Sequence, residues 1–177
     1  MDSLIENLGL LCLAIDSGEN NMITGRTKLQ KIIYFSKYLD WNVGEYRLHY
    51  YGPFSFDLAD TLRTAKDANL VKENEASLPY EYNLTESGRD FLKKFLQKVC
   101  DNNKAERTRN LFQQLSEWSK ENLELAATID YVYSNKPRVS KASLLEKVQR
   151  IKENYSPSSI QNAYGKWFAL KRSLSKA

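Results

Sequence analysis

The stretch from residue 26 to residue 62, RTKLQKIIYFSKYLDWNVGEYRLHYYGPFSFDLADTL, most constrains what this chain can fold into. Apolar side chains recur at helical spacing in its first third and cover several sides, which predicts a helix at the centre of a core. Thr27 and Gln30 have the spacing of a capping box, so we expect this helix to begin at Thr27. Its solvated edge is then expected to consist of Lys28, Lys31 and Lys37.

A short strand and a second helix follow in the same stretch. Residues 46–50 alternate two kinds of side chain at period two, which predicts a strand. Gly52-Pro53 is expected to end that strand, because the pair is typical of turns. Ser55 is then a natural N-cap for a helix that ends near Asn69.

The rest of the chain adds one hairpin and otherwise only helices. Helical spacing of apolar residues predicts a first helix over residues 3–16. Two short runs, 70–72 and 80–84, predict a hairpin, after which Thr85 caps another helix. Beyond residue 100 the periodicity predicts four more helices.

These elements predict an α+β fold that is mostly helical. The order helix, helix, strand, helix, hairpin, helix over residues 1–100 is the outline of a winged helix-turn-helix-like core with a small β-hairpin. Residues 101–177 are expected to form a C-terminal helical bundle packed on that core. A length of 177 residues fits one domain with such a helical extension.

The charge is unevenly divided along the chain. The formal net charge is +4, but residues 1–100 carry 12 Lys and Arg against 14 Asp and Glu, whereas residues 101–177 carry 14 against 8. Any attraction to phosphate is therefore expected from the C-terminal part. No run approaches the ~18 apolar residues that a membrane span needs, so we expect a cytoplasmic protein without a membrane partner.

Residue types suited to catalysis or to metal binding are scarce. His49 is the only histidine, which excludes sites that need two imidazoles. Cys12 and Cys100 are far apart, and neither lies near a second ligand type at metal spacing. The chain also has no glycine-rich phosphate loop, nucleophile elbow or dinucleotide fingerprint. We therefore predict no catalytic residue, no metal, no cofactor and no enzymatic activity; an unfamiliar active site is the alternative.

Several motifs resemble one protein family. The runs KLQKIIY at 28–34 and HYYGPFS at 49–55, with LAD at 58–60, LTESG at 84–88 and LELAA at 123–127, are similar to the YwgA-type family of bacteria and archaea. More distantly, KLQK and YGP resemble the Panacea domain of phage-associated proteins and antitoxins. The resemblance spans about residues 26–133. It implies a winged-helix-like core and a regulatory or antitoxin-like interaction role, and it implies no catalytic residues.

A winged-helix core raises the question of DNA binding. The expected recognition helix, residues 55–69, has three Asp against one Arg and one Lys, and the hairpin tip, residues 73–79, has two Glu and no basic residue. Carboxylates at these positions oppose phosphate, so DNA reading by this unit is not expected. A nucleic-acid contact, the alternative function, is instead expected from a basic set: Lys136, Arg138, Lys141, Lys147, Arg150 and Lys152. A solvated face is the simpler interpretation of these residues.

A protein partner is the interpretation that we prefer. Tyrosine is favoured in interfaces because it combines apolar area with a polar tip. The predicted interaction surface, called the tyrosine set below, consists of Tyr38, Tyr46, Tyr50, Tyr51, Gly52 and Pro53. The opposing interpretation is a small core filled with tyrosines whose hydroxyls reach the surface. The sequence thus predicts a non-enzymatic regulatory or antitoxin-like protein-interaction module, with a winged-helix transcriptional regulator as the alternative.

Overall fold

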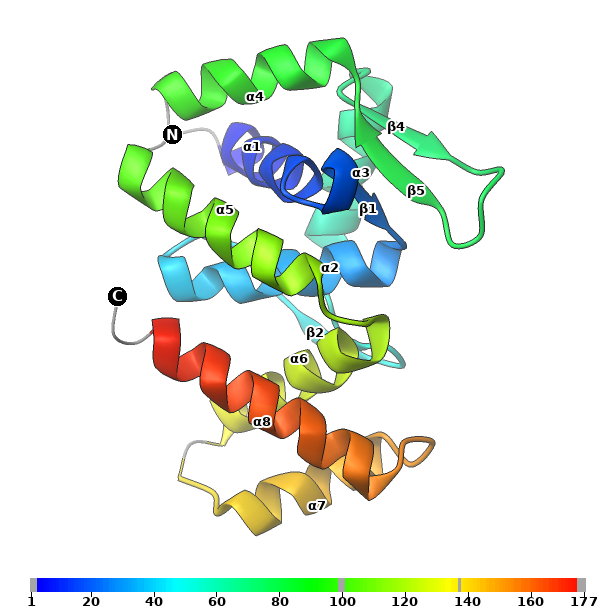
Figure 1. Cartoon of the computed structure of the whole chain (residues 1–177), viewed down its shortest axis with the longest axis vertical. Coiled ribbons are helices and arrows are strands. Elements are labelled where there is room, and N and C mark those ends of the chain that lie inside the picture. The colour runs from blue at the N-terminus through cyan, green and yellow to red at the C-terminus, as the bar shows by residue number, and fades with distance from the viewer. Residues whose placement is uncertain (1–2, 99–100, 137, 175–177) are drawn as a thin grey trace.

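A computed structural model describes residues 3–98, 101–136 and 138–174 of the chain (Figure 1). The elements in chain order are α1 (Ser3–Asp16), a 3-10 turn (Glu19–Asn21), β1 (Met22–Thr24), α2 (Arg26–Phe35), a second 3-10 turn (Ser36–Leu39), β2 (Arg47–His49), β3 (Gly52–Phe54), α3 (Phe56–Asp67), β4 (Val71–Asn74), β5 (Glu81–Leu84), α4 (Glu86–Lys98), α5 (Asn102–Ser116), α6 (Lys120–Asn135), α7 (Lys141–Ile151) and α8 (Pro157–Leu174). Helices dominate and the strands form two small antiparallel sheets, which confirms the predicted α+β, mostly helical fold class. None of the helices in the described ranges is long and apolar enough to cross a membrane.

The helices are stacked along the long axis of the molecule (Figure 1). α4 and α1 lie at one end beside the three-stranded sheet, α2 and α5 cross the middle, and α6, α7 and α8 form the other end. One core runs through the stack and includes fully buried side chains from both halves of the chain, among them Phe35, Phe112 and Leu123. The predicted domain boundary at residue 100 stays a prediction, and this core continues across it.

The three-stranded sheet has the order β1-β5-β4. Its β4–β5 hairpin lies where the sequence predicts it, with Val71 opposite Leu84. β1 is an addition: Ile23 pairs opposite Tyr82 of β5, and both side chains are buried. A three-residue segment is too short to show a period of its own, so its strand conformation depends on the partner strand.

Two local predictions in the central stretch were wrong. α2 begins at Arg26, after Gly25 at a φ of 91°, and no side chain caps it. Gln30 does not reach back to the helix start, because its side-chain amide accepts from the Ser55 N–H at 3.0 Å and donates to the Ser55 carbonyl at 2.9 Å. Gly52 and Pro53 do not end a strand, because they form β3, which pairs with β2 so that His49 lies opposite Gly52.

The predicted N-caps are confirmed where they depend only on local chemistry. The Ser55 hydroxyl accepts from the Leu58 N–H at the start of α3, and the Thr85 hydroxyl accepts from the Gly88 N–H at the start of α4. Each hydroxyl satisfies a first-turn donor that the helix itself leaves open. The helix boundaries near these positions follow from the sequence for this reason.

Candidate functional site

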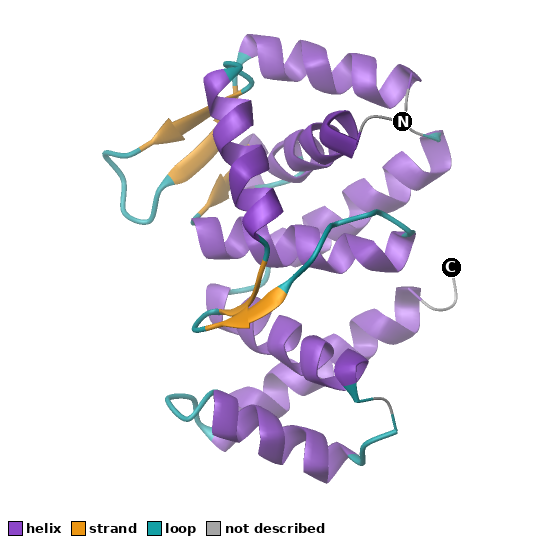
Figure 2. Ribbon diagram, turned by 180° about the vertical axis from the view of Figure 1, so that it is seen from behind, coloured by secondary structure: helices purple, strands orange, loops and turns teal. Residues whose placement is uncertain are grey.

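Three stretches that carry the family resemblance meet at the β2–β3 hairpin. Figure 2 shows the molecule from the side opposite to Figure 1; in this view the hairpin lies nearest the viewer, over the place where α2 and α6 meet. The KLQK run supplies Lys31 from α2, the LELAA run supplies Glu124 from α6, and the YYGP run forms the hairpin turn and the start of β3. Residues far apart in sequence therefore converge beneath one turn.

Two buried lysines donate hydrogen bonds to backbone carbonyls on either side of this turn. Lys31 Nζ donates to the Pro53 carbonyl at 2.6 Å, and Lys152 Nζ donates to the Tyr50 carbonyl at 2.5 Å. Lys152 also forms an ion pair with Glu124, with 2.6 Å between Nζ and Oε1. The exposed fractions are 1% for Lys31, 4% for Lys152 and 2% for Glu124. We call Lys31, Glu124 and Lys152 the lysine clamp.

The charges of the lysine clamp do not balance. It contains two ammonium groups and one carboxylate, and Lys31 forms no ion pair within the described ranges. Burial lowers the pKa of Lys31 to about 7; the charge of Glu124 opposes this shift and the charge of Lys152 adds to it. Glu124 Oε2 is buried and accepts no hydrogen bond of standard geometry from the residues described; burial and the nearby Glu124 carboxylate, to which the Tyr155 hydroxyl can donate, raise the pKa of Tyr155 to about 12. An unsatisfied buried carboxylate oxygen is unusual and calls for an explanation.

The hairpin turn requires glycine at position 52. Gly52 has a φ of 81°, a conformation that other residues rarely adopt. A Cβ at this position would lie 2.8 Å from Thr128 Oγ1 and 3.3 Å from the Glu124 carbonyl oxygen. The turn therefore approaches α6 more closely than any other residue type would allow.

Three cavities surround the hairpin. The α2 cavity, of about 520 Å³, lies between the start of α2, the hairpin and residues 78–80. The α7 cavity, of about 850 Å³, lies between the hairpin and residues 151–155. A third, the α6–α7 cavity of about 390 Å³, is lined by residues of α6 and α7 and by Leu48 of the hairpin. His49 and Tyr51 line the first two cavities, so the hairpin turn separates them.

Exposed apolar side chains gather around the same hairpin. Their exposed fractions range from 39% for Leu48 to 86% for Leu78. Each of them either lines one of the three cavities or, in the case of Phe56, packs its ring 5.1 Å from that of Phe54. This group, called the hairpin surface below, consists of Leu48, Tyr50, Tyr51, Phe56, Leu78 and Ile151.

The tyrosine set is divided by the structure. Tyr46, Tyr50, Tyr51, Gly52 and Pro53 belong to the hairpin or its entry, with Tyr50 and Tyr51 exposed and Gly52 and Pro53 buried. Tyr46 is half-buried and its hydroxyl donates to the Gln30 carbonyl at 3.3 Å. Tyr38 is not part of the hairpin, and its hydroxyl donates a hydrogen bond to Asp130 of α6. Whether these residues contact a partner stays a prediction.

The basic set is divided as well. Lys152 is not an exposed basic residue, because it is buried in the lysine clamp. Lys136, Lys147 and Arg150 line the α6–α7 cavity, and Arg150 pairs with Glu146 at 2.5 Å. Lys141 lines a different cavity, between α7 and α8, and Arg138 is exposed in the loop before α7. A contact with nucleic acid stays a prediction for the five exposed or half-buried members.

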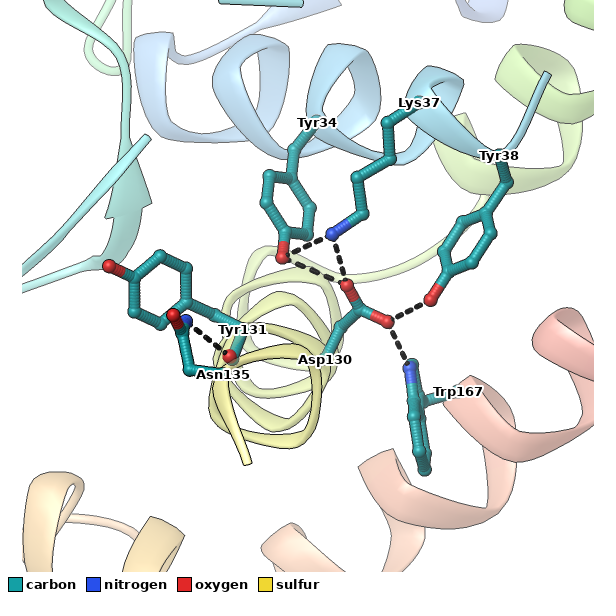
Figure 3. A network of polar contacts seen from close by, with 7 residues as sticks. All are labelled: Tyr34, Lys37, Tyr38, Asp130, Tyr131, Asn135 and Trp167. Carbon is teal, nitrogen blue, oxygen red and sulfur yellow. Dashed lines mark hydrogen bonds and ion pairs between the residues drawn. The ribbon is translucent and has the colours of Figure 1, made fainter. Parts of the chain in front are cut away.

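A second buried polar cluster joins α2 to α6 and α8 (Figure 3). Asp130, which is fully buried, accepts from Tyr34 Oη at 2.8 Å, from Lys37 Nζ at 2.6 Å and from Trp167 Nε1 at 2.8 Å, and also from the Tyr38 hydroxyl. Burial and the neighbouring Asp130 charge raise the pKa of Tyr34 and of Tyr38, so both hydroxyls remain donors. We call this cluster the Asp130 hub.

The expectation of a solvated lysine edge on α2 was therefore wrong at two positions. Lys31 is buried in the lysine clamp and Lys37 is paired in the Asp130 hub. The signal was present in the sequence, because a helix that is apolar on several sides leaves little solvent for a lysine within it. The partners, the Pro53 carbonyl of β3 for Lys31 and Asp130 of α6 for Lys37, could not be identified from α2.

The groups with catalytic or metal-binding potential are dispersed. His49 is exposed, with its ring 5.9 Å from that of Phe54. Burial raises the pKa of the Cys12 thiol to about 12, so it stays protonated, and Cys100 lies outside the described residues. Within the described ranges no three His, Cys, Asp or Glu residues are grouped as metal ligands. The prediction that the protein is not an enzyme stays a prediction.

A curated protein is similar to part of this chain, whereas no family model matches the chain. The similar protein is the "Uncharacterized protein YwgA" of Bacillus subtilis (strain 168), which is 42% identical over 96 residues. The match covers 50% of this chain and 55% of that protein, so the chain spans about half the length of the relative. This similarity supports the resemblance to the YwgA-type family; the more distant likeness to the Panacea domain stays an expectation.

Proposed function

We propose that this protein is a non-enzymatic regulatory, antitoxin-like module that binds a protein partner through the hairpin surface. The observation that carries the proposal is the gathering of exposed apolar side chains around one hairpin, beside three cavities. Exposed apolar groups of this kind, rimmed by polar residues, are typical of protein-binding sites. Cavities next to exposed aromatic rings can accept side chains of the partner.

The hairpin is also held firmly enough to act as a preformed surface. The lysine clamp fixes both sides of the turn, and Gly52 allows the turn to pack directly on α6. Side chains on a preorganised backbone lose less conformational entropy when a partner binds. β2 pairs with β3 alone among the described strands, so its outer edge can accept an extended segment of the partner as an added strand.

We further propose that α1, β1, α2, α3, β4 and β5 form a winged-helix-type unit that does not read DNA through α3. The β2–β3 hairpin is inserted between α2 and α3, where winged-helix proteins have a short turn. Arg63 of α3 pairs with Asp60 at 3.0 Å, and Lys66 pairs with Glu73 of β4. Because a carboxylate lies beside each of these basic groups and repels phosphate, the unit offers little to DNA, which favours a protein partner.

Site-specific photocrosslinking tests the protein-binding proposal. A photoreactive amino acid replaces Tyr51 in one variant and the exposed Lys94 of α4 in a matched control, and cells that make the protein are irradiated. We expect a discrete protein adduct from position 51 that is absent from position 94 and is reduced when Leu48→Ser is added. The proposal fails if position 51 gives no adduct, or if both positions give the same adducts.

A second candidate function, nucleic-acid binding by the C-terminal helices, is favoured by one observation. The cavity between α7 and α8, of about 320 Å³, combines four aromatic rings with three basic side chains: Tyr133, Tyr164, Trp167, Phe168, Lys141, Lys171 and Arg172. Lys171 Nζ lies 3.8 Å from the centroid of the Tyr133 ring, and Lys141 Nζ lies 4.7 Å from that of Tyr164. Aromatic rings beside cations are typical of proteins that stack the bases of single strands.

Salt-dependent binding to labelled single-stranded and duplex DNA tests this alternative. We expect affinity that falls steeply with salt and is lost in the double variant Arg138→Glu with Lys141→Glu, whereas Lys94→Glu leaves it unchanged. Affinity that is insensitive to the double variant would exclude a contact at this surface. Tighter binding of the single strand would point to the aromatic cavity.

A further inference from the structure

The α2 cavity has walls of two kinds. Rings from Tyr51, Phe54 and Tyr80, with Leu78 and Pro79, make most of the lining apolar. Arg26, Lys31 and His49 add three basic side chains to the lining, and no Asp or Glu of the described residues lines it; the Arg26 guanidinium also lies 3.8 Å from Glu73 Oε1 of β4. Its volume of about 520 Å³ lies within the range of roughly 300–1,000 Å³ that is typical of small-molecule sites.

The start of α2 opens into this cavity. Gly25, Arg26 and Thr27 line the wall, and no side chain caps the helix at Gly25. The first backbone N–H groups of a helix have no partner within the helix, and the helix dipole adds positive potential there. An anion is the ligand that such a position favours.

Lys31 provides the independent argument, because its charge is not compensated. An ammonium group has three N–H donors, and Lys31 uses one of them, on the Pro53 carbonyl. The carboxylate of Glu124 is already paired with Lys152. When Lys31 is protonated, the buried lysine clamp therefore carries one more positive than negative charge, which is costly unless a counter-charge is near.

We propose that the α2 cavity binds a small organic anion. Its carboxylate or phosphate would lie toward Lys31, Thr27 and the start of α2, with Arg26 at the mouth of the cavity. Its apolar or aromatic body would pack against the rings that line the opposite wall. The bound anion supplies the counter-charge that Lys31 lacks within the described residues, and the ligand is distinct from the protein partner of the hairpin surface.

Isothermal titration with two anions and their matched neutral analogues tests the proposal. Adenosine monophosphate and indole-3-acetate carry a phosphate and a carboxylate on aromatic bodies, and adenosine and indole-3-ethanol are the uncharged controls. We expect at least one anion to bind with a Kd below about 1 mM and its neutral analogue to bind at least about tenfold more weakly. The anion that binds identifies phosphate or carboxylate as the recognised group.

Two variants locate the site. Lys31→Met and Arg26→Gln should each weaken binding about tenfold, whereas Lys94→Met on the far helix α4 should leave it unchanged. Arg26→Gln is the second variant because the Arg26 side chain is 56% exposed; since it also removes the ion pair with Glu73, urea unfolding of both variants is measured beside the titration. Binding should also take up protons at about pH 8 in the wild type but not in Lys31→Met, because the anion favours the charged lysine, whose pKa burial lowers to about 7.

Three results would overturn the proposal. The first is that neither anion saturates, and the second is that the neutral analogues bind as tightly as the anions. The third is that both variants keep the wild-type affinity, which would place the bound anion elsewhere. None of these results depends on the crosslinking of a protein partner, so the small-ligand site and the protein-binding function can fail separately.

Discussion

The Asp130 hub and the lysine clamp are both buried polar clusters between α2 and α6, yet they differ in how completely their groups are satisfied. In the hub, both carboxylate oxygens of Asp130 accept hydrogen bonds, and its charge is matched by Lys37. In the clamp, Glu124 Oε2 accepts no hydrogen bond of standard geometry from the described residues, and Lys31 forms no ion pair among them. Asp130 itself lines none of the cavities described above, although Trp167 of the hub lines the cavity between α7 and α8, whereas Glu124 lines the α7 cavity and Lys31 lines the α2 cavity.

This difference separates a structural cluster from a candidate binding site. A closed hydrogen-bond network fixes the relative positions of helices and gains nothing from a ligand. An open cluster with unbalanced charge next to a cavity is costly for folding, and such costs are typical of functional sites. The two clusters should therefore respond in opposite ways to the removal of a charge.

Asp130→Ala should have the largest effect on stability. The substitution leaves the Lys37 ammonium and the Trp167 N–H without their acceptor, so we expect a loss of about 3–5 kcal/mol in the free energy of unfolding. Urea unfolding measures it. Asp60→Ala on α3 is the control, because that carboxylate is exposed and its loss should cost within about 0.5 kcal/mol. Equal losses at the two positions would contradict a structural role of the hub.

Gly52→Ala should have the next largest effect. A φ of 81° is strained for alanine, and its Cβ would lie 2.8 Å from Thr128 Oγ1, so we expect a loss of about 1–3 kcal/mol. Gly165→Ala in α8 is the matched control with the opposite sign, because no atom lies within 4 Å of the added Cβ. Alanine in a helix interior should stabilise by up to about 1 kcal/mol. If Gly52→Ala leaves the free energy of unfolding unchanged, the close packing of the hairpin on α6 is contradicted.

Lys31→Met should have the smallest effect near pH 6, and the size and sign of the effect should change as the pH rises. Near pH 6 the buried charge is costly, so we expect Met to lose less than about 1 kcal/mol or to stabilise. The pKa of Lys31 falls from 10.5 to about 7 on folding, so between these values the unfolded chain binds a proton that the folded chain lacks. The stability of the wild type should therefore rise with pH relative to the variant, by up to about 1.4 kcal/mol per pH unit.

Urea unfolding of both proteins between about pH 7 and pH 9 measures this difference. The upper limit avoids Cys12, whose pKa is raised from 9.0 to about 12, so that its titration in the unfolded state lowers stability above pH 9. Parallel pH profiles for wild type and Lys31→Met would show that Lys31 does not change its protonation on folding. The charge argument for the α2 cavity would then lose its basis.

Features that depend on a few neighbouring residues could be predicted from the sequence. The caps at Ser55 and Thr85, the β4–β5 hairpin and the helices beyond residue 100 all follow from local hydrogen bonding and from the 3.6-residue period. The α2 helix was also predicted, but the capping box predicted for it does not form. The Gln30 side chain forms hydrogen bonds with the backbone N–H and carbonyl of Ser55, which is 25 residues away. A rule based on spacing within one helix cannot predict such a partner.

The site illustrates the same limit more strongly. The KLQK run could be recognised as part of a central helix, whereas the turn predicted at Gly52-Pro53 lies at the two preceding residues, because Gly52 and Pro53 belong to β3. That Lys31 and Lys152 hold the turn, and that Glu124 lies beneath it, could not be predicted, because these contacts join residues 22, 28 and 102 positions apart. Lysine is usually exposed, so a basic residue is assigned to the surface unless its partner is known.

The sequence by itself determined the fold class, most helix boundaries and the place of the β4–β5 hairpin, since these depend on periodicity, capping and backbone preference. Only the tertiary structure decided which charges are buried, which of them are balanced and which cavities they line. The physical reason is that the free energy of a buried charge depends on every group packed around it, and those groups come from distant parts of the chain.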